Sequence, residues 1–175
     1  IFNPDAKGKS IDALFDGLPF VEGKYKIVLA GYFSQPFDKK VEILISSHNL
    51  ADKVILVKKF LETEERFHYL NAADIVLLPY ESTYKRNKAT SHILAECIVL
   101  RKAVIITNGV AEGDELVKRN ELGLVLNDDP IDWSKNLNYA LKNLNKIKET
   151  AWKNSVAIRH RWDYKEELKK VYEIS

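Results

Sequence analysis

The segment SHILAECIVLRKAVIITN, residues 91–108, places one carboxylate in an otherwise apolar stretch with helical spacing. On a helical wheel of about 100° per residue, Leu94 and Ile98 fill one side and Val99 lies beside Glu96. The predicted helix therefore has no clean solvent face. Because an unpaired carboxylate in apolar surroundings is costly, we expect hydrogen-bond donors in front of Glu96.

The residues just before this helix are suited to binding an anion. Thr90 and Ser91 are favoured N-cap residues, and the free amides of the next turn lie at the positive end of the helix. Arg86 and Lys88 add positive charge on the approach. A ribose would present two hydroxyl donors to Glu96 while its diphosphate lay over the helix start. This combination is typical of a nucleotide site.

The elements that must position these residues follow a regular alternation. Short β-branched runs predict strands at residues 24–31, 53–60, 74–80, 103–108 and 123–127, and helical spacing predicts helices at 9–18, 38–49, 62–72, 91–100 and 114–118. Strands alternating with helices indicate an α/β fold with a Rossmann-like, doubly wound parallel sheet. In such sheets, ligands bind beyond the carboxyl ends of the strands.

From Ile131 to Ser175 the pattern is wholly helical, with a break expected near Arg161. We therefore predict a Rossmann-like region over residues 1–130 and a helical tail over 131–175. The tail is expected to pack on the same single domain, because 175 residues are ample for one core and short for two.

Composition excludes several classes of protein. A net charge of +2 does not suggest a partner among nucleic acids. Apolar runs fall short of the roughly 20 residues of a membrane helix. The lone Cys97 favours a reducing compartment, so we expect a cytoplasmic protein. Since the chain has no methionine and begins Ile-Phe-Asn, we expect one domain of a longer polypeptide.

Familiar catalytic motifs are absent from the sequence. The first strand is followed by a single glycine rather than GxGxxG, and there is no GxxxxGK[ST] or GxSxG. The four histidines are scattered and no Cys-x-x-Cys accompanies them. These absences disfavour a dinucleotide dehydrogenase, a P-loop enzyme, an α/β-hydrolase and a zinc site. We expect no metal and no cofactor.

Six segments carry a further pattern: GKSIDAL (8–14), AADIVLLPY (72–80), SHILAECIVLRKAVIITN (91–108), DELV (114–117), GLVLN (123–127) and RWDYKEELKKVY (161–172). Their order and spacing resemble the C-terminal, nucleotide-sugar-binding domain of GT-B glycosyltransferases of the family 4 type, the "glycosyl transferases group 1" domain. The resemblance implies one half of a GT-B fold. It also implies retaining transfer of a sugar to a glycan, glycolipid or glycoprotein acceptor, as in polysaccharide biosynthesis.

The resemblance also implies a role for individual residues. Glu96 would bind the ribose hydroxyls, and Lys9 would lie near the donor diphosphate. The phosphates would meet the backbone amides of Thr90 and Ser91. The full set implied for the nucleotide sugar is Lys9, Lys58, Phe60, Arg86, Lys88, Thr90, Ser91, Glu96 and Glu115, where the loop from Lys58 to Phe60 faces the base. The donor would be a UDP-, GDP- or ADP-sugar. No catalytic residue is implied.

The chain departs from the family pattern in several places, which include Asn3 in place of an arginine near the start and Ala111-Glu112 in place of a double glycine before Glu115. Lys88 stands where the family has the first glutamate of its E-x7-E pair, and a lysine cannot accept hydrogen bonds from sugar hydroxyls. The glycine-rich turn before the helix is Ala89-Thr90-Ser91 here, which narrows the room for phosphate. Arg86 or Lys88 would then supply the positive charge, or donor binding has weakened.

Other functions therefore stay open. One is a degenerate, non-catalytic module for assembly or regulation, in which Glu96 is a structural carboxylate bonded to amides or to a lysine. Another is a nucleotide-sugar epimerase of the same fold. In the glycosyltransferase reading, an N-terminal domain of the same polypeptide binds the acceptor, and membrane association arises only through that half. The isolated domain is then expected to be inactive.

Overall fold

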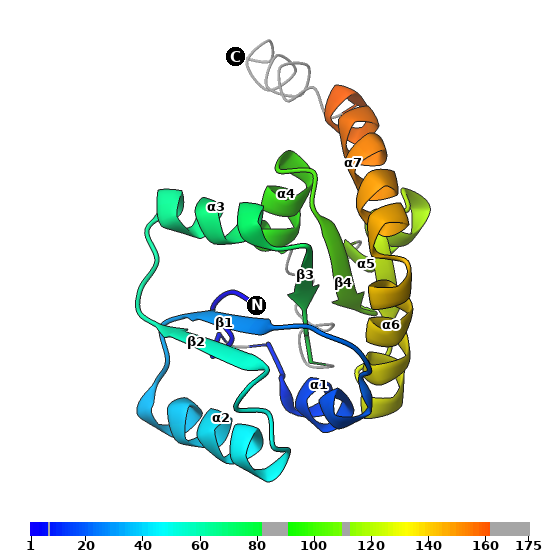
Figure 1. The fold of residues 1–175 in the computed structure, drawn as a ribbon. Coiled ribbons are helices and arrows are strands. Elements are labelled where there is room, and N and C mark those ends of the chain that lie inside the picture. The colour runs from blue at the N-terminus through cyan, green and yellow to red at the C-terminus, as the bar shows by residue number, and fades with distance from the viewer. Residues whose placement is uncertain (7, 82–90, 110–112, 162–175) are drawn as a thin grey trace.

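The computed structural model describes residues 1–6, 8–81, 91–109 and 113–161, which form alternating strands and helices (Figure 1). In chain order the elements are α1 (Asp12–Gly17), the short 3-10 helix η1 (Leu18–Phe20), β1 (Ile27–Gly31), α2 (Gln35–Ser47), β2 (Val54–Lys58), α3 (Thr63–Ala72), β3 (Ile75–Leu78), α4 (His92–Val99), β4 (Ala103–Thr107), α5 (Gly113–Arg119), β5 (Gly123–Leu126), α6 (Pro130–Lys142) and α7 (Leu144–Arg161). The predicted α/β alternation is confirmed.

The strands pair in parallel, in two hydrogen-bonded groups. One group is β1 with β2, and the other has the order β3, β4, β5. Ile27 lies opposite Val54 in the first group, and Ile75 lies opposite Ala103 in the second. The chain start lies between β1 and β3 (Figure 1), and Phe2 pairs with Ala30 of β1. The parallel arrangement confirms the βαβ prediction, while the division into two groups was not predicted.

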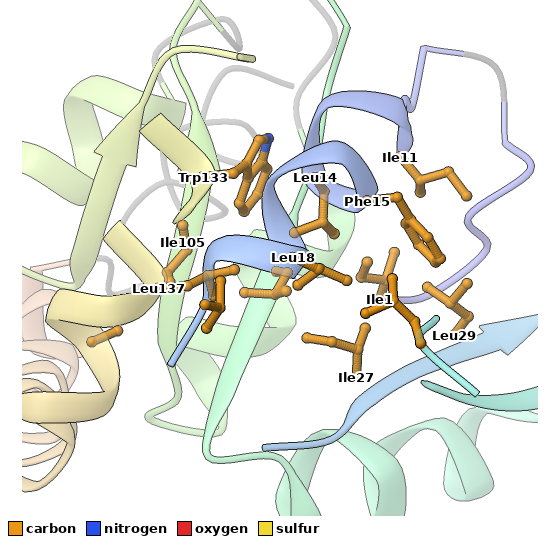
Figure 2. Packing of buried hydrophobic residues seen from close by; sticks show 14 of the residues in the cluster. Ile1, Ile11, Leu14, Phe15, Leu18, Ile27, Leu29, Ile105, Trp133 and Leu137 are labelled. Carbon is orange, nitrogen blue, oxygen red and sulfur yellow. The ribbon is translucent and has the colours of Figure 1, made fainter. Parts of the chain in front are cut away.

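The largest buried cluster joins α1, β1 and α6. Phe15 and Leu29 are fully buried together with Trp133, which lies beside Leu14 of α1 (Figure 2). Gly17 makes this contact possible, because a Cβ there would lie 2.6 Å from the carbonyl oxygen of Pro130. A second buried cluster lies among α3, α4, β3 and β4 and supports the carboxyl ends of the strands.

The C-terminal helices begin with α6 at Pro130. Asp129 caps α6 by accepting a hydrogen bond from the Asp132 amide at 2.9 Å, and Pro130 occupies the first turn. The tail also breaks at Asn143, between α6 and α7, which was not predicted. The break expected near Arg161 falls where the described residues end. Among those residues, no helix combines the length and the apolar character needed to cross a bilayer.

Candidate functional site

The carboxyl ends of β3 and β4 are tied together by a side chain. The Tyr80 amide donates a hydrogen bond to the Thr107 hydroxyl at 2.9 Å, and that hydroxyl donates back to the Tyr80 carbonyl at 2.8 Å. Thr107 is fully buried. Both strands thus end at a fixed position, which is the edge where doubly wound sheets bind ligands.

Helix α4 starts at this edge. The Ser91 hydroxyl accepts a hydrogen bond from the Leu94 amide at 3.1 Å, so Ser91 is the N-cap, as the sequence predicts. It also lies 2.5 Å from the Tyr80 hydroxyl. The cap is therefore held by the end of β3. The positive end of the α4 dipole lies at the carboxyl edge of the sheet.

Lys9, near the beginning of the chain, lies beside Tyr80 and the start of α4; we call this region, around Lys9, Tyr80 and Ser91, the corner. The amide of Ser10 donates to the Pro79 carbonyl and that of Glu81 to the Gly8 carbonyl, each at 3.0 Å, which places the two segments antiparallel. The Lys9 ammonium donates to the Phe2 carbonyl and lies 5.8 Å from the centre of the Tyr80 ring. Burial lowers the pKa of Lys9 to about 8. An incompletely hydrated cation therefore lies near the start of α4.

Glu96 is half-buried and has an arginine partner. The Arg66 guanidinium of α3 donates through Nε to Glu96 Oε2 at 3.1 Å and through its terminal nitrogen to Oε1 at 2.7 Å. The side chains are 25% exposed for Arg66 and 20% for Glu96. The expected donors in front of Glu96 are thus confirmed in part. Arg66 was missed by sequence analysis, where the need of a buried carboxylate for a cation was the only signal.

One expectation about α4 is wrong. The helix does have a solvent face, since His92 and Ala95 are exposed and the Val99 side chain is 54% exposed. Leu94, Cys97 and Ile98 form the buried face. Glu96 lies between the two faces, which gives its carboxylate access to solvent despite the apolar composition of the helix.

Other predicted site residues lie apart from this corner. The Lys58 ammonium pairs with Asp38 and Glu42 of α2, and these carboxylates raise its pKa. Phe60 follows β2 and is 73% exposed. Glu115 is exposed on α5 and lies 3.9 Å from Arg119. Arg86, Lys88 and Thr90 lie outside the described residues. Of the predicted set, Lys9 and Ser91 both lie beside Tyr80, and Glu96 follows Ser91 along α4.

The chemistry of this corner is electrostatic and hydrogen-bonding. Cys97 is fully buried, and burial raises the pKa of its thiol to about 12, so it is not a nucleophile at neutral pH. Over the part of the chain that the structure describes, no three His, Cys, Asp or Glu side chains are grouped to hold a metal ion. The groups that remain available for chemistry are the Lys9 ammonium, the start of α4 and the half-buried Glu96 carboxylate.

Comparison with known proteins identifies the fold. No family model and no curated protein matches the sequence. Among solved structures, Anabaena Alr3699/HepE in complex with UDP and glucose has a TM-score of 0.77 at 17% identity, over 97% of this chain and 45% of that one. A glycosyltransferase from Rickettsia africae gives 0.73 at 20% identity, over 97% and 44%. The chain has the fold of one half of a GT-B glycosyltransferase.

A third structure supports this assignment. The catalytic domain of cholesterol-alpha-glucosyltransferase from Helicobacter pylori has a TM-score of 0.66 at 14% identity, over 90% of this chain and 94% of that one. The chain spans less than half the length of the first solved structures it matches. The fold implied by the sequence resemblance is thus confirmed.

Proposed function

We propose that the chain is the donor-binding half of a retaining glycosyltransferase and binds a nucleotide diphospho-sugar. The observation that carries this proposal is the placement of α4, which starts at Ser91 on the carboxyl edge of the sheet. Glu96 follows one and a half turns later, and Lys9 lies at the same corner. The diphosphate and the ribose are neighbouring parts of one nucleotide, so a single nucleotide would contact both the start of α4 and Glu96.

The helix start and Lys9 would bind the diphosphate. Amides in the first turn of a helix point toward an anion, and the macrodipole favours negative charge there. The ammonium of Lys9 would exchange its contact with the Phe2 carbonyl for a phosphate oxygen, which is the stronger acceptor. These groups would also stabilise the leaving nucleoside diphosphate without a metal ion or a cofactor.

Glu96 would accept hydrogen bonds from the ribose hydroxyls. An ionised carboxylate has about four acceptor positions, and a bidentate arginine uses about two of them. The Arg66 contact therefore leaves acceptor capacity on both oxygens of Glu96. Phe60, exposed at the end of β2, would offer an aromatic face to the base. Acceptor binding, retention and transfer would require the other half of the polypeptide.

The Arg66 contact also favours a second candidate, the degenerate module for assembly or regulation. If the guanidinium satisfies Glu96 completely, the pair is a structural link between α3 and α4. Glu96 would then add nothing to the affinity for a nucleotide. The lysine at position 88 also favours the degenerate module.

Ligand-detected NMR with UDP, GDP, ADP and their sugars separates the two candidates. We expect one nucleotide to bind the wild-type chain and to lose most of its affinity in Glu96→Gln and Lys9→Ala. Glu149→Gln is the matched control, because that carboxylate is exposed on α7 and pairs only with Lys153 among the contacts seen. Absence of binding by every nucleotide would favour the degenerate module.

A further inference from the structure

The Arg66 guanidinium meets the Glu96 carboxylate as a fork. Arg66 donates through Nε to Glu96 Oε2 at 3.1 Å and through a terminal nitrogen to Oε1 at 2.7 Å. Two parallel N–H groups that reach both oxygens of one carboxylate lie close to the plane of that carboxylate. Arg66 therefore occupies the two acceptor positions of Glu96 that point the same way, one on each oxygen.

The acceptor positions that remain on Glu96 point in different directions. An ionised carboxylate has about four acceptor positions, two on each oxygen. When a fork occupies the two that point the same way, the other two lie at opposite ends of the carboxylate and diverge. Each oxygen of Glu96 can thus accept one more hydrogen bond, but the two donors must approach from opposite sides.

Arg66 is held in this position by α3. Its amide donates to the Glu62 carbonyl at 2.9 Å, and its guanidinium lies 5.8 Å from the centre of the Phe67 ring. Leu70, one turn later, is fully buried in the second cluster and fixes the helix there. Since the Arg66 and Glu96 side chains are only 25% and 20% exposed, their separation would leave two partly desolvated charges unpaired. A ligand therefore meets the pair intact.

A ribose presents its 2′ and 3′ hydroxyls side by side on one face of the ring. A carboxylate without a partner can accept both at once, one at each oxygen, in the forked geometry that Arg66 uses here. In this chain that geometry is already occupied at Glu96. Two adjacent hydroxyls cannot reach acceptor positions at opposite ends of the carboxylate, so one hydroxyl is left without this contact.

We propose that Arg66 restricts Glu96 to a single ribose hydroxyl and so determines the specificity of the site. This inference rests on the proposed function, because it concerns how Glu96 binds the ribose of a nucleoside diphosphate. A nucleoside diphosphate that lacks the other hydroxyl binds almost as well as the parent ribonucleotide. The ligand class of the site therefore includes one kind of deoxynucleotide, either 2′-deoxy or 3′-deoxy.

Deoxy analogues test the proposal on the wild-type chain. Dissociation constants are measured by ligand-detected NMR for UDP, GDP and ADP, and then for the 2′-deoxy and 3′-deoxy forms of whichever nucleotide binds. Loss of a hydrogen bond to a charged group weakens binding by about tenfold or more. We expect one deoxy form to bind within about threefold of the parent nucleotide, and the other to bind about tenfold or more weakly.

Arg66→Met tests whether the guanidinium causes this selectivity. Methionine removes the fork and frees the two acceptor positions that point the same way, so both deoxy forms should bind this variant about tenfold or more weakly than the parent nucleotide does. Each comparison is made within one variant, so a loss of stability affects all three ligands equally. Arg101→Met is the matched control, because that guanidinium follows α4 and lies 4.8 Å from the centre of the Trp152 ring. It should keep the wild-type pattern.

Three results would overturn the proposal. Weak binding of both deoxy forms to the wild type would show that Glu96 accepts both hydroxyls beside Arg66, and weak binding of neither would show that it accepts none. An unchanged pattern in Arg66→Met would show that the guanidinium does not set the selectivity. If Arg66→Met does not fold, the wild-type pattern decides alone. Absence of binding by all three parent nucleotides would instead contradict the proposed function, and this inference would fall with it.

Discussion

Arg66 and Glu96, thirty residues apart in sequence, form a bidentate ion pair that joins α3 to α4 with contacts of 3.1 and 2.7 Å. The pair lies at the side of α4 and is three-quarters or more buried in both side chains. It explains how a carboxylate is tolerated in an apolar helix. It also fixes the direction in which the Glu96 carboxylate faces.

Removing the guanidinium should destabilise the chain. In Arg66→Ala the carboxylate of Glu96 loses its partner while most of its burial remains, and we expect the free energy of unfolding to fall by about 1–3 kcal/mol. Urea unfolding measures this change. Arg119→Ala is the control, since its pair with Glu115 is exposed and should be worth less than about 1 kcal/mol. Equal effects in the two variants would show that the buried pair has no special role.

Nucleotide binding should take up a proton at alkaline pH. Burial holds the pKa of Lys9 at about 8, and a neighbouring diphosphate would raise it again. Above pH 8 the free chain has lost much of the Lys9 charge, so affinity should decline as the pH rises. Calorimetry at pH 8.5 in two buffers with different ionisation enthalpies measures the uptake. Lys9→Met should abolish it, and a wild-type chain without uptake would place the phosphates elsewhere.

The same lysine affects stability without ligand. The unfolded chain binds the Lys9 proton up to about pH 10.5, while the folded chain releases it near 8. Between these values the unfolded state binds more protons, so the Lys9 contribution to stability increases as the pH rises. We expect the unfolding free energy of the wild type to rise relative to that of Lys9→Met as the pH increases over this range. A difference that is independent of pH would contradict the lowered pKa.

Loss of the N-cap of α4 should lower the free energy of unfolding of the chain. Ser91→Ala removes the acceptor for the Leu94 amide and the contact with the Tyr80 hydroxyl, and N-cap losses typically cost about 1 kcal/mol. Ser47→Ala is a suitable comparison, because that hydroxyl is exposed and contacts only the Leu44 carbonyl at 3.3 Å among the bonds seen. Chemical denaturation should separate the two variants; a Ser91→Ala chain as stable as Ser47→Ala would contradict the cap.

Gly17→Ala should destabilise, although alanine favours helices over glycine by about 1 kcal/mol. The added Cβ would lie 2.6 Å from the Pro130 carbonyl oxygen and 3.2 Å from the Cβ of Trp133. Overpacking of this kind typically costs about 1–3 kcal/mol. Thermal unfolding gives the sign directly: a raised midpoint would mean that α1 and α6 are not in close contact.

The alternation of strands and helices could be predicted because it depends on local patterns. The run AVIIT has four apolar residues before Thr107 and forms the fully buried β4, and Ser91 before an apolar helix forms its N-cap. The Arg66 partner could not be predicted in this way, because thirty residues separate it from Glu96 and no spacing rule connects α3 to α4. The break at Asn143 and the division of the strands depend on tertiary packing, which a local pattern does not specify.

A ¹⁵N titration of the wild-type chain with UDP, GDP or ADP sugars tests the central claim most directly. If α4 is the donor site, amide shifts should concentrate at His92 and Ile93, where an anion meets the helix start, and at Glu96, where ribose binds. Shifts of the same amides should be lost in Glu96→Gln and kept in Glu149→Gln. Shifts confined to the surface around Asp114 and Lys118, or no shifts at saturating nucleotide, would contradict the account.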